Sequence, residues 1–92
     1  MSESTDDSGP PQGVRILTFA GVREVVGSSS IEISLAEACS AAELMDLICA
    51  RYPALTPRRP SIRLAVNGAY VKPGDPVAPG DEVALIPPVA GG

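Results

Sequence analysis

The sequence of 92 residues contains one segment with a clear helical pattern, and in most other patterned segments apolar and polar side chains alternate. This combination restricts the folds that the chain can adopt. The helix is expected over 41–51, where Ser40 and Glu43 have the spacing of a capping box. In such a box the serine hydroxyl accepts a hydrogen bond from the Glu43 amide, and the glutamate carboxylate accepts one from the Ser40 amide. The positions expected to face a core recur at i, i+3, i+4 and i+7, namely Leu44, Leu47, Ile48 and Arg51.

The other patterned segments are predicted to be strands. Their side chains alternate with a two-residue period over Val14–Phe19, Ile31–Leu35, Ser61–Val66 and Glu82–Ile86. Asn67-Gly68 is a hairpin-turn signal that leads into a short return strand, Ala69–Val71. Residues 20–26 are expected to form a short helical turn ended by Gly27. The first two strands then pair most simply as a wide hairpin.

This order of elements predicts a two-layer α+β domain, because one helix covers only one face of such a sheet. A hairpin, a helix and then further strands favour the ubiquitin-like β-grasp. That fold has a mixed sheet, with its first and last strands side by side in the centre and one main helix packed on one face. The segment 53–60 holds three prolines plus Arg58 and Arg59, so we expect a constrained, solvated loop there.

The two ends of the chain are expected to lie outside this domain. Residues 1–13 lack Ile, Leu, Val and Phe and carry three acids without a base, which predicts a disordered acidic leader. Without that leader the net charge changes from −4 to −1, since 7 bases then face 8 acids. We therefore expect a leader over 1–13, a β-grasp domain over 14–86 and a flexible tail over 87–92.

The composition excludes several classes of function. The chain has no histidine, which rules out Ser-His-Asp and Cys-His catalysis and His-ligated metal sites. A charge of −4 with three aromatic residues argues against nucleic-acid binding. No apolar run approaches a membrane span, and no signal peptide is evident. Two cysteines, Cys39 and Cys49, are too few for a disulfide framework, so a cytoplasmic location is expected. Because histidine is absent, we also expect a non-catalytic protein without a bound metal or cofactor.

The face of the sheet turned away from the helix is a candidate partner surface. If Val14, Ile16 and Thr18 point inward, Leu17 and Phe19 point outward, beside Ile86 and Tyr70 in neighbouring strands. A contiguous exposed apolar patch usually marks a partner surface. The opposite parity would bury Phe19 in the core, and alternation alone permits both choices. The other outward positions are expected to be Ala65 and Ala84.

The end of the chain is the second candidate site. Pro87 and Pro88 prevent the last strand from continuing and stiffen the exit, because each fixes φ and lacks an N–H. Val89 and Ala90 lead to Gly91-Gly92, which has no side chains and can thread a narrow channel. The Gly92 carboxylate is a poor electrophile until a partner enzyme activates it, so the chain would be a carrier rather than a catalyst.

Three segments together resemble a known family. ILTFAGVREVVG, AVNGAYV with PGDEVALIPP, and the ending PPVAGG are similar to the small subunits of molybdopterin synthase, the MoaD-type ubiquitin-like sulfur carriers. The resemblance covers about Val14 to Gly92. Its most specific parts are the terminal PPVAGG and an FA-x-x-RE segment formed by Phe19, Ala20, Arg23 and Glu24.

The resemblance implies a chemistry for the tail. An adenylyltransferase related to ubiquitin-activating enzymes would use ATP to form an acyl-adenylate on Gly92, and a sulfur donor would convert it to a thiocarboxylate. The tail, Pro87 to Gly91, would then insert into a pocket of the large synthase subunit, which holds the catalytic residues. Delivered sulfur turns cyclic pyranopterin monophosphate into molybdopterin. The family also implies a heterotetramer.

The resemblance further implies that the outward apolar face docks both partners. The matched positions are Phe19, Tyr70 and Ile86, and they favour an outward Phe19. Separately from the resemblance, Arg23 and Glu24 are expected either to orient the turn or to meet a partner at a charged rim. Tyr70 departs from the family, where an aliphatic side chain is usual. Three other hypotheses remain: a carrier for thiazole or cysteine biosynthesis, a protein modifier that joins lysines through Gly92, and a plain β-grasp interaction module.

Overall fold

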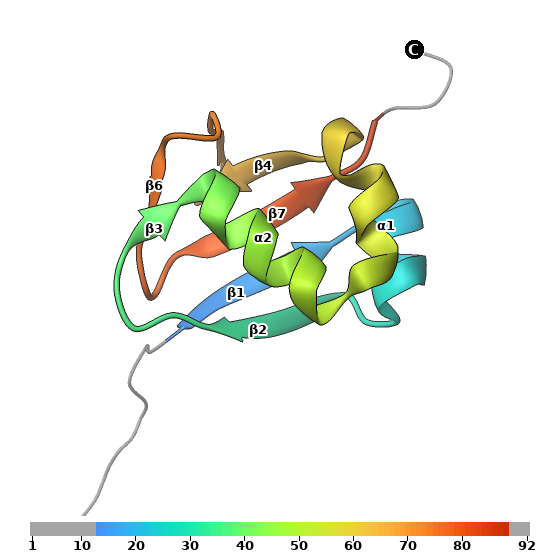
Figure 1. Ribbon diagram of the computed structural model, residues 1–92, viewed down its shortest axis with the longest axis horizontal. Coiled ribbons are helices and arrows are strands. Elements are labelled where there is room, and N and C mark those ends of the chain that lie inside the picture. Colours follow the sequence, from blue (N-terminus) through green and yellow to red (C-terminus); the bar gives the residue numbers. More distant parts are fainter. Residues whose placement is uncertain (1–12, 89–92) are drawn as a thin grey trace, which may run out of the picture.

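The computed structural model describes residues 13–88, and the elements of this part are shown in Figure 1. In chain order they are β1 (Gly13–Thr18), α1 (Ala20–Val26), β2 (Ser30–Ser34), β3 (Cys39–Ser40), α2 (Ala41–Arg51), the 3-10 helix η2 (Pro53–Ser61), β4 (Arg63–Val66), β5 (Ala69–Tyr70), β6 (Pro76–Val77) and β7 (Glu82–Ile86). The predicted leader, apart from Gly13, and residues 89–92 of the predicted tail lie outside the described residues.

The main sheet has five strands in the order β2-β1-β7-β4-β5. β1 pairs antiparallel with β2 and parallel with β7, while β4 pairs antiparallel with both β7 and β5. The first and last strands therefore lie side by side in the centre, and the predicted ubiquitin-like β-grasp is confirmed. Because β1 and β7 are parallel, the described chain begins and ends at opposite ends of the domain (Figure 1).

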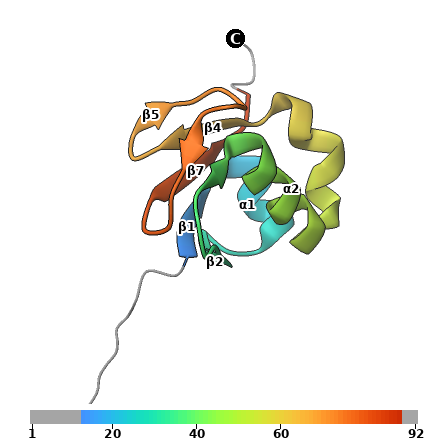
Figure 2. The same cartoon turned by 60° about the vertical axis from the view of Figure 1, so that its left-hand side comes forward.

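The helices cover one face of the sheet and leave the other bare. Figure 2 shows the sheet strands in one layer and α1 and α2 in the other. Between the layers lies the core, to which β1 contributes Val14 and Ile16, both fully buried. Thr18 is also buried, and its hydroxyl donates to the carbonyl of Ser28, which satisfies it. These three side chains confirm the predicted parity of β1.

The capping box of α2 is confirmed, but two of its four predicted core-facing residues, Leu47 and Arg51, are exposed. The Glu43 amide donates to Ser40 Oγ over 3.0 Å, and the Ser40 amide donates to the Glu43 carboxylate over 2.9 Å. Leu47 is 43% exposed. The buried stripe consists of Ala41, Leu44, Met45, Ile48 and Cys49. At 3.6 residues per turn Leu47 lies roughly 120° from the middle of that stripe.

The segment 53–60 is mostly exposed as predicted, but it is a helix and not a loop. These residues form η2, which packs against α1 and α2. Pro53 stands at the start of this helix, where its missing N–H costs no hydrogen bond. Leu55 is completely buried, and Arg59 is half-buried. The prolines do constrain the segment, but it forms a helix whose buried side chain is that of Leu55.

Short elements also escaped the sequence patterns. β3 and β6 pair as a separate two-stranded sheet and bury Val77 completely. Two residues are too few to show alternation. β1 begins at Gly13, which pairs with Ser34, one residue before the predicted boundary. The predicted left-handed ends are present, with φ of 85° at Gly27 and a turn through Asn67 and Gly68 at 51° and 90°.

Candidate functional site

The bare face of the sheet carries an apolar surface that surrounds a shallow hollow of about 310 Å³. We define the apolar surface by its six nonpolar and aromatic side chains: Leu17, Phe19, Ala65, Tyr70, Ala84 and Ile86. Gly68 and Glu82 complete the lining of the hollow. Ala65 points outward as predicted yet is only 7% exposed, because its larger neighbours surround it.

Phe19 points outward because the chain turns immediately after β1. It is the N-cap of α1, with extended φ and ψ of −137° and 153°. Its carbonyl accepts hydrogen bonds from the amides of Val22 and Arg23, at 3.0 and 3.2 Å. The next residue, Ala20, has a left-handed φ of 47°. Phe19 is 47% exposed, so the alternative that buried it in the core is excluded.

Tyr70 and Ile86 join Phe19 on the same surface. Tyr70 stands on β5 opposite Ala65, and at 59% it is more exposed than Phe19. The guanidinium carbon of Arg63 lies 4.7 Å from the centre of the Tyr70 ring. Ile86 ends β7 and pairs with Arg63 on β4. The structure therefore brings the three predicted docking residues together, and it adds Arg63 as their neighbour.

Arg63 was missed as part of this surface, although its parity provided a signal. It lies two positions before the outward Ala65 on the same strand, so both side chains point to the bare face. Arg23, in contrast, lies on the exposed side of α1 and does not line the hollow. Its predicted role at the rim stays a prediction.

The tail leaves the domain from the edge of the apolar surface. β7 is the central strand of the sheet and ends at Ile86, a lining residue of the hollow. Pro87 follows half-buried and Pro88 exposed. The remaining predicted tail residues, Val89, Ala90, Gly91 and Gly92, lie outside the described residues. A protein that covers the apolar surface would therefore meet the root of the tail.

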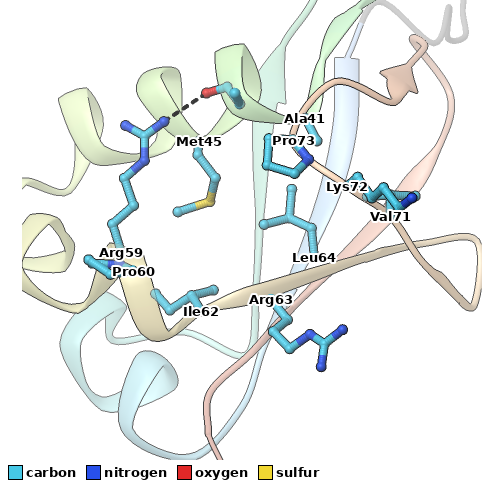
Figure 3. Close-up of a pocket in the computed structure, with 11 residues that line it drawn as sticks. Ala41, Met45, Arg59, Pro60, Ile62, Arg63, Leu64, Val71, Lys72 and Pro73 are labelled. Atoms are coloured by element: carbon cyan, nitrogen blue, oxygen red, sulfur yellow. Dashed lines mark hydrogen bonds between the residues drawn. The ribbon is translucent and has the colours of Figure 1, made fainter.

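A second cavity, of about 540 Å³, opens between α2, the end of η2 and β4 (Figure 3). Met45 from α2 and Leu64 from β4 point toward one another across its middle. Arg59 lies on its rim, where its guanidinium donates to the Ala42 carbonyl over 3.0 Å and pairs with the Asp46 carboxylate. The lining has no thiol, hydroxyl or carboxylate, and the lining offers no acid to work with its one amine, that of Lys72.

The two cysteines are poorly suited to sulfur chemistry. Cys49 is buried, and both thiols are free. Burial, and then the charge of Glu43, raise the pKa of the Cys39 thiol above its ordinary value. A thiol with a raised pKa is less often a thiolate at neutral pH and is a weaker nucleophile. Neither the buried Cys49 nor Cys39 is therefore well suited to carry sulfur.

Residues 13–88 contain no group of three or more potential metal ligands among their Cys, Asp and Glu side chains. The helices in this part of the chain are too short or too polar to cross a lipid bilayer.

Comparisons with known proteins agree on one family. Residues 16–92 match the model of the ThiS family. The molybdopterin synthase sulfur carrier subunit of Homo sapiens is 40% identical over 82 residues, which cover 86% of this chain and 93% of that protein. The crystal structure of small archaeal modifier protein 1 from Haloferax volcanii matches with a TM-score of 0.78 and 30% identity, over 87% of this chain and 99% of that one.

A third match is a chain from the complex of subunits 1 and 2 of the molybdopterin-converting factor of Helicobacter pylori. It covers 87% of this chain and 99% of its own length, with a TM-score of 0.61 and 20% identity. At this identity the likeness shows a shared fold.

Proposed function

The chain belongs to the ThiS family, and we propose that it is a sulfur carrier for molybdopterin synthesis. One observation carries the proposal: the central strand β7 runs from an exposed apolar surface directly into Pro87 and Pro88. The chain then ends in Gly91-Gly92. A carrier needs a docking surface and, joined to it, a tail without bulky side chains that ends in a carboxylate. The 40% identical carrier subunit of Homo sapiens supports this assignment.

The proposed chemistry takes place on the Gly92 carboxylate. A carboxylate oxygen attacks the α-phosphorus of ATP on an activating enzyme, and pyrophosphate leaves. A sulfur donor at the persulfide level then attacks the acyl-adenylate carbon and displaces AMP. Reductive cleavage of the resulting sulfur–sulfur bond by a thiol leaves the thiocarboxylate. ATP is thus used by the partner enzyme, and the chain itself needs no bound cofactor.

The proposed receiver of the sulfur is the large subunit of the synthase. The apolar surface is exposed in this chain, and burial of such a surface provides most of the driving force for association. Phe19, Tyr70 and Ile86 would contact the large subunit while the tail enters its pocket. The Helicobacter pylori protein with the same fold forms a complex of subunits 1 and 2, which is a two-subunit assembly of this kind. A cytoplasmic location stays a prediction from the cysteine count.

A protein modifier is the second candidate. The fold matches small archaeal modifier protein 1 with a TM-score of 0.78. In this proposal both roles would begin with activation of the Gly92 carboxylate. They differ in the final acceptor, which is a lysine amine for a modifier and a pterin for a carrier. A carrier for thiazole or cysteine biosynthesis would share the thiocarboxylate and differ in the compound that receives its sulfur.

The test is to follow the intact mass of the chain after incubation with its activating enzyme, ATP and a sulfur donor. We expect a gain equal to the difference between one sulfur and one oxygen atom. Addition of the large subunit and cyclic pyranopterin monophosphate should reverse the gain and yield molybdopterin. An unchanged mass would contradict the carrier proposal, and lasting conjugates through lysine would favour the modifier.

The Phe19→Ala substitution is expected to weaken binding to the large subunit by about 2 kcal/mol, or roughly 30-fold in Kd. The reason is that an exposed aromatic ring beside a hollow is a typical interface anchor. Titration calorimetry measures the change. Leu47→Ala, which removes an exposed apolar side chain from the helical layer, is the control and should leave Kd unchanged. Equal affinity of the Phe19 variant and the wild type would exclude this docking surface.

A further inference from the structure

The charges on the bare face of the sheet are balanced at one end and unbalanced at the other. Arg15 on β1 pairs across the strands with Glu32 on one side and Glu82 on the other, so opposite charges are neighbours there. At the end from which the tail leaves, Arg63 pairs with Ile86 instead. No acid in residues 13–88 lies within ion-pair distance of Arg63. Among the described residues, the tail end of this face therefore carries an uncompensated positive charge.

Tyr70 holds this charge in a defined place. The Arg63 guanidinium lies over its ring at 4.7 Å, a distance typical of a cation–π contact. Within residues 13–88 the Arg63 guanidinium has no hydrogen-bond acceptor, so its N–H donors are available. Those donors form a planar fork that matches a carboxylate. Arg63 is thus oriented by a neighbour while its hydrogen-bonding edge is available to another molecule.

The other cations near Arg63 have acids beside them. Arg63 also lines the second cavity, together with Arg59 and Lys72, and no acid lines it (Figure 3). Arg59 is compensated by Asp46, and the Asp75 carboxylate accepts from the Lys72 amide over 2.9 Å. Arg63 is therefore the cation of this lining that no acid of residues 13–88 accompanies, and a charge at the edge of an apolar surface raises the rate at which an oppositely charged partner arrives.

We propose that Arg63, stacked on Tyr70, receives a carboxylate of the protein that covers the apolar surface, and that this contact determines which partner is accepted. The inference rests on the proposed function for the identity of that protein, the large subunit. The partner must then present an apolar pocket for the Tyr70 ring with an Asp or Glu at its border. A partner with a neutral border would leave the guanidinium desolvated without an acceptor, which lowers affinity.

The experiment measures association and dissociation rates of the full chain with the large subunit at several salt concentrations. Arg63→Gln is expected to weaken binding about 10-fold and Arg63→Glu on the order of 30-fold or more, through slower association and faster dissociation together. The salt dependence of the association rate should flatten in Arg63→Gln. Arg51→Glu is the matched control, since Arg51 is an exposed arginine of α2, in the helical layer. It should change Kd by less than about twofold, as expected for a charge outside the interface.

The role of Tyr70 is tested by a double-mutant cycle. Tyr70→Phe keeps the ring and should preserve the effect of Arg63, whereas Tyr70→Leu should remove most of it. The Arg63→Gln, Tyr70→Leu double variant is then expected to lose less affinity than the two single losses multiplied together. Thermal unfolding of each variant shows whether it is folded. If Arg63→Glu does not fold, Arg63→Gln alone provides the test.

Two results overturn the inference, and they are distinguishable. If the wild type binds the large subunit and Arg63→Glu binds like Arg51→Glu, the charged contact is absent while the proposed function stands. If the wild type itself does not bind the large subunit, the proposed function fails and the inference fails with it.

Discussion

Removal of Gly92 is expected to slow sulfur delivery by at least about 100-fold, because a displacement of even about 1 Å at a reacting centre can cost that much. The shortened chain still ends in a carboxylate, now on Gly91. It is shorter by one residue, however, which withdraws the reacting carbon by about 3.5 Å along an extended tail. The measurement is molybdopterin formed per minute with the large subunit, alongside the intact mass after activation.

The control for this deletion is the stability of the domain. The core ends with β7, so the midpoint of urea unfolding should be the same with and without Gly92. Gly92→Ala keeps the length of the tail and adds only a Cβ. It therefore distinguishes the effect of a shorter tail from the effect of a wider last residue. Full sulfur delivery by the chain that ends at Gly91 would show that Gly92 is not the carrying residue.

Leu55→Ala is expected to lower the free energy of unfolding by about 3 kcal/mol, within the range for a fully buried leucine whose removal leaves a cavity. Leu55 anchors η2, which packs against both α1 and α2. A loss of this size is a large part of the stability of a small domain. Urea denaturation followed by circular dichroism measures the change.

Leu47→Ala is the matched control, because it makes the same chemical change at a leucine that is 43% exposed. It should cost less than about 1 kcal/mol. If the two variants are equally destabilised, η2 does not bury Leu55, and the segment is the solvated loop that the prolines suggest.

Most of the fold could be predicted because it rests on local rules. The capping box of Ser40 and Glu43 joins groups three residues apart, and the turn at Asn67-Gly68 requires a positive φ. Alternation located the long strands, and one helix for a whole sheet implied two layers. β3 and β6 could not be found in this way, since pairing between two-residue strands depends on where the rest of the chain places them.

The candidate site was also predicted only in part from the sequence. The outward positions Phe19, Tyr70 and Ile86 follow from parity together with the family resemblance, and the structure places them around one hollow. The contact of Arg63 with Tyr70 could not be foreseen. These residues belong to two strands, and the distance between their side chains depends on the register of β4 against β5 and on side-chain rotamers.

The order of the residues was enough to locate the long strands and the capped helix, and to assign Ala84 and Ile86 to the outward side of β7. The packing of the elements was needed to learn that Leu55 is buried while Leu47 is exposed, and that no acid of residues 13–88 forms an ion pair with Arg63. Periodicity describes one element at a time. Burial and charge balance depend on which elements meet, and those contacts join residues that are distant in the chain.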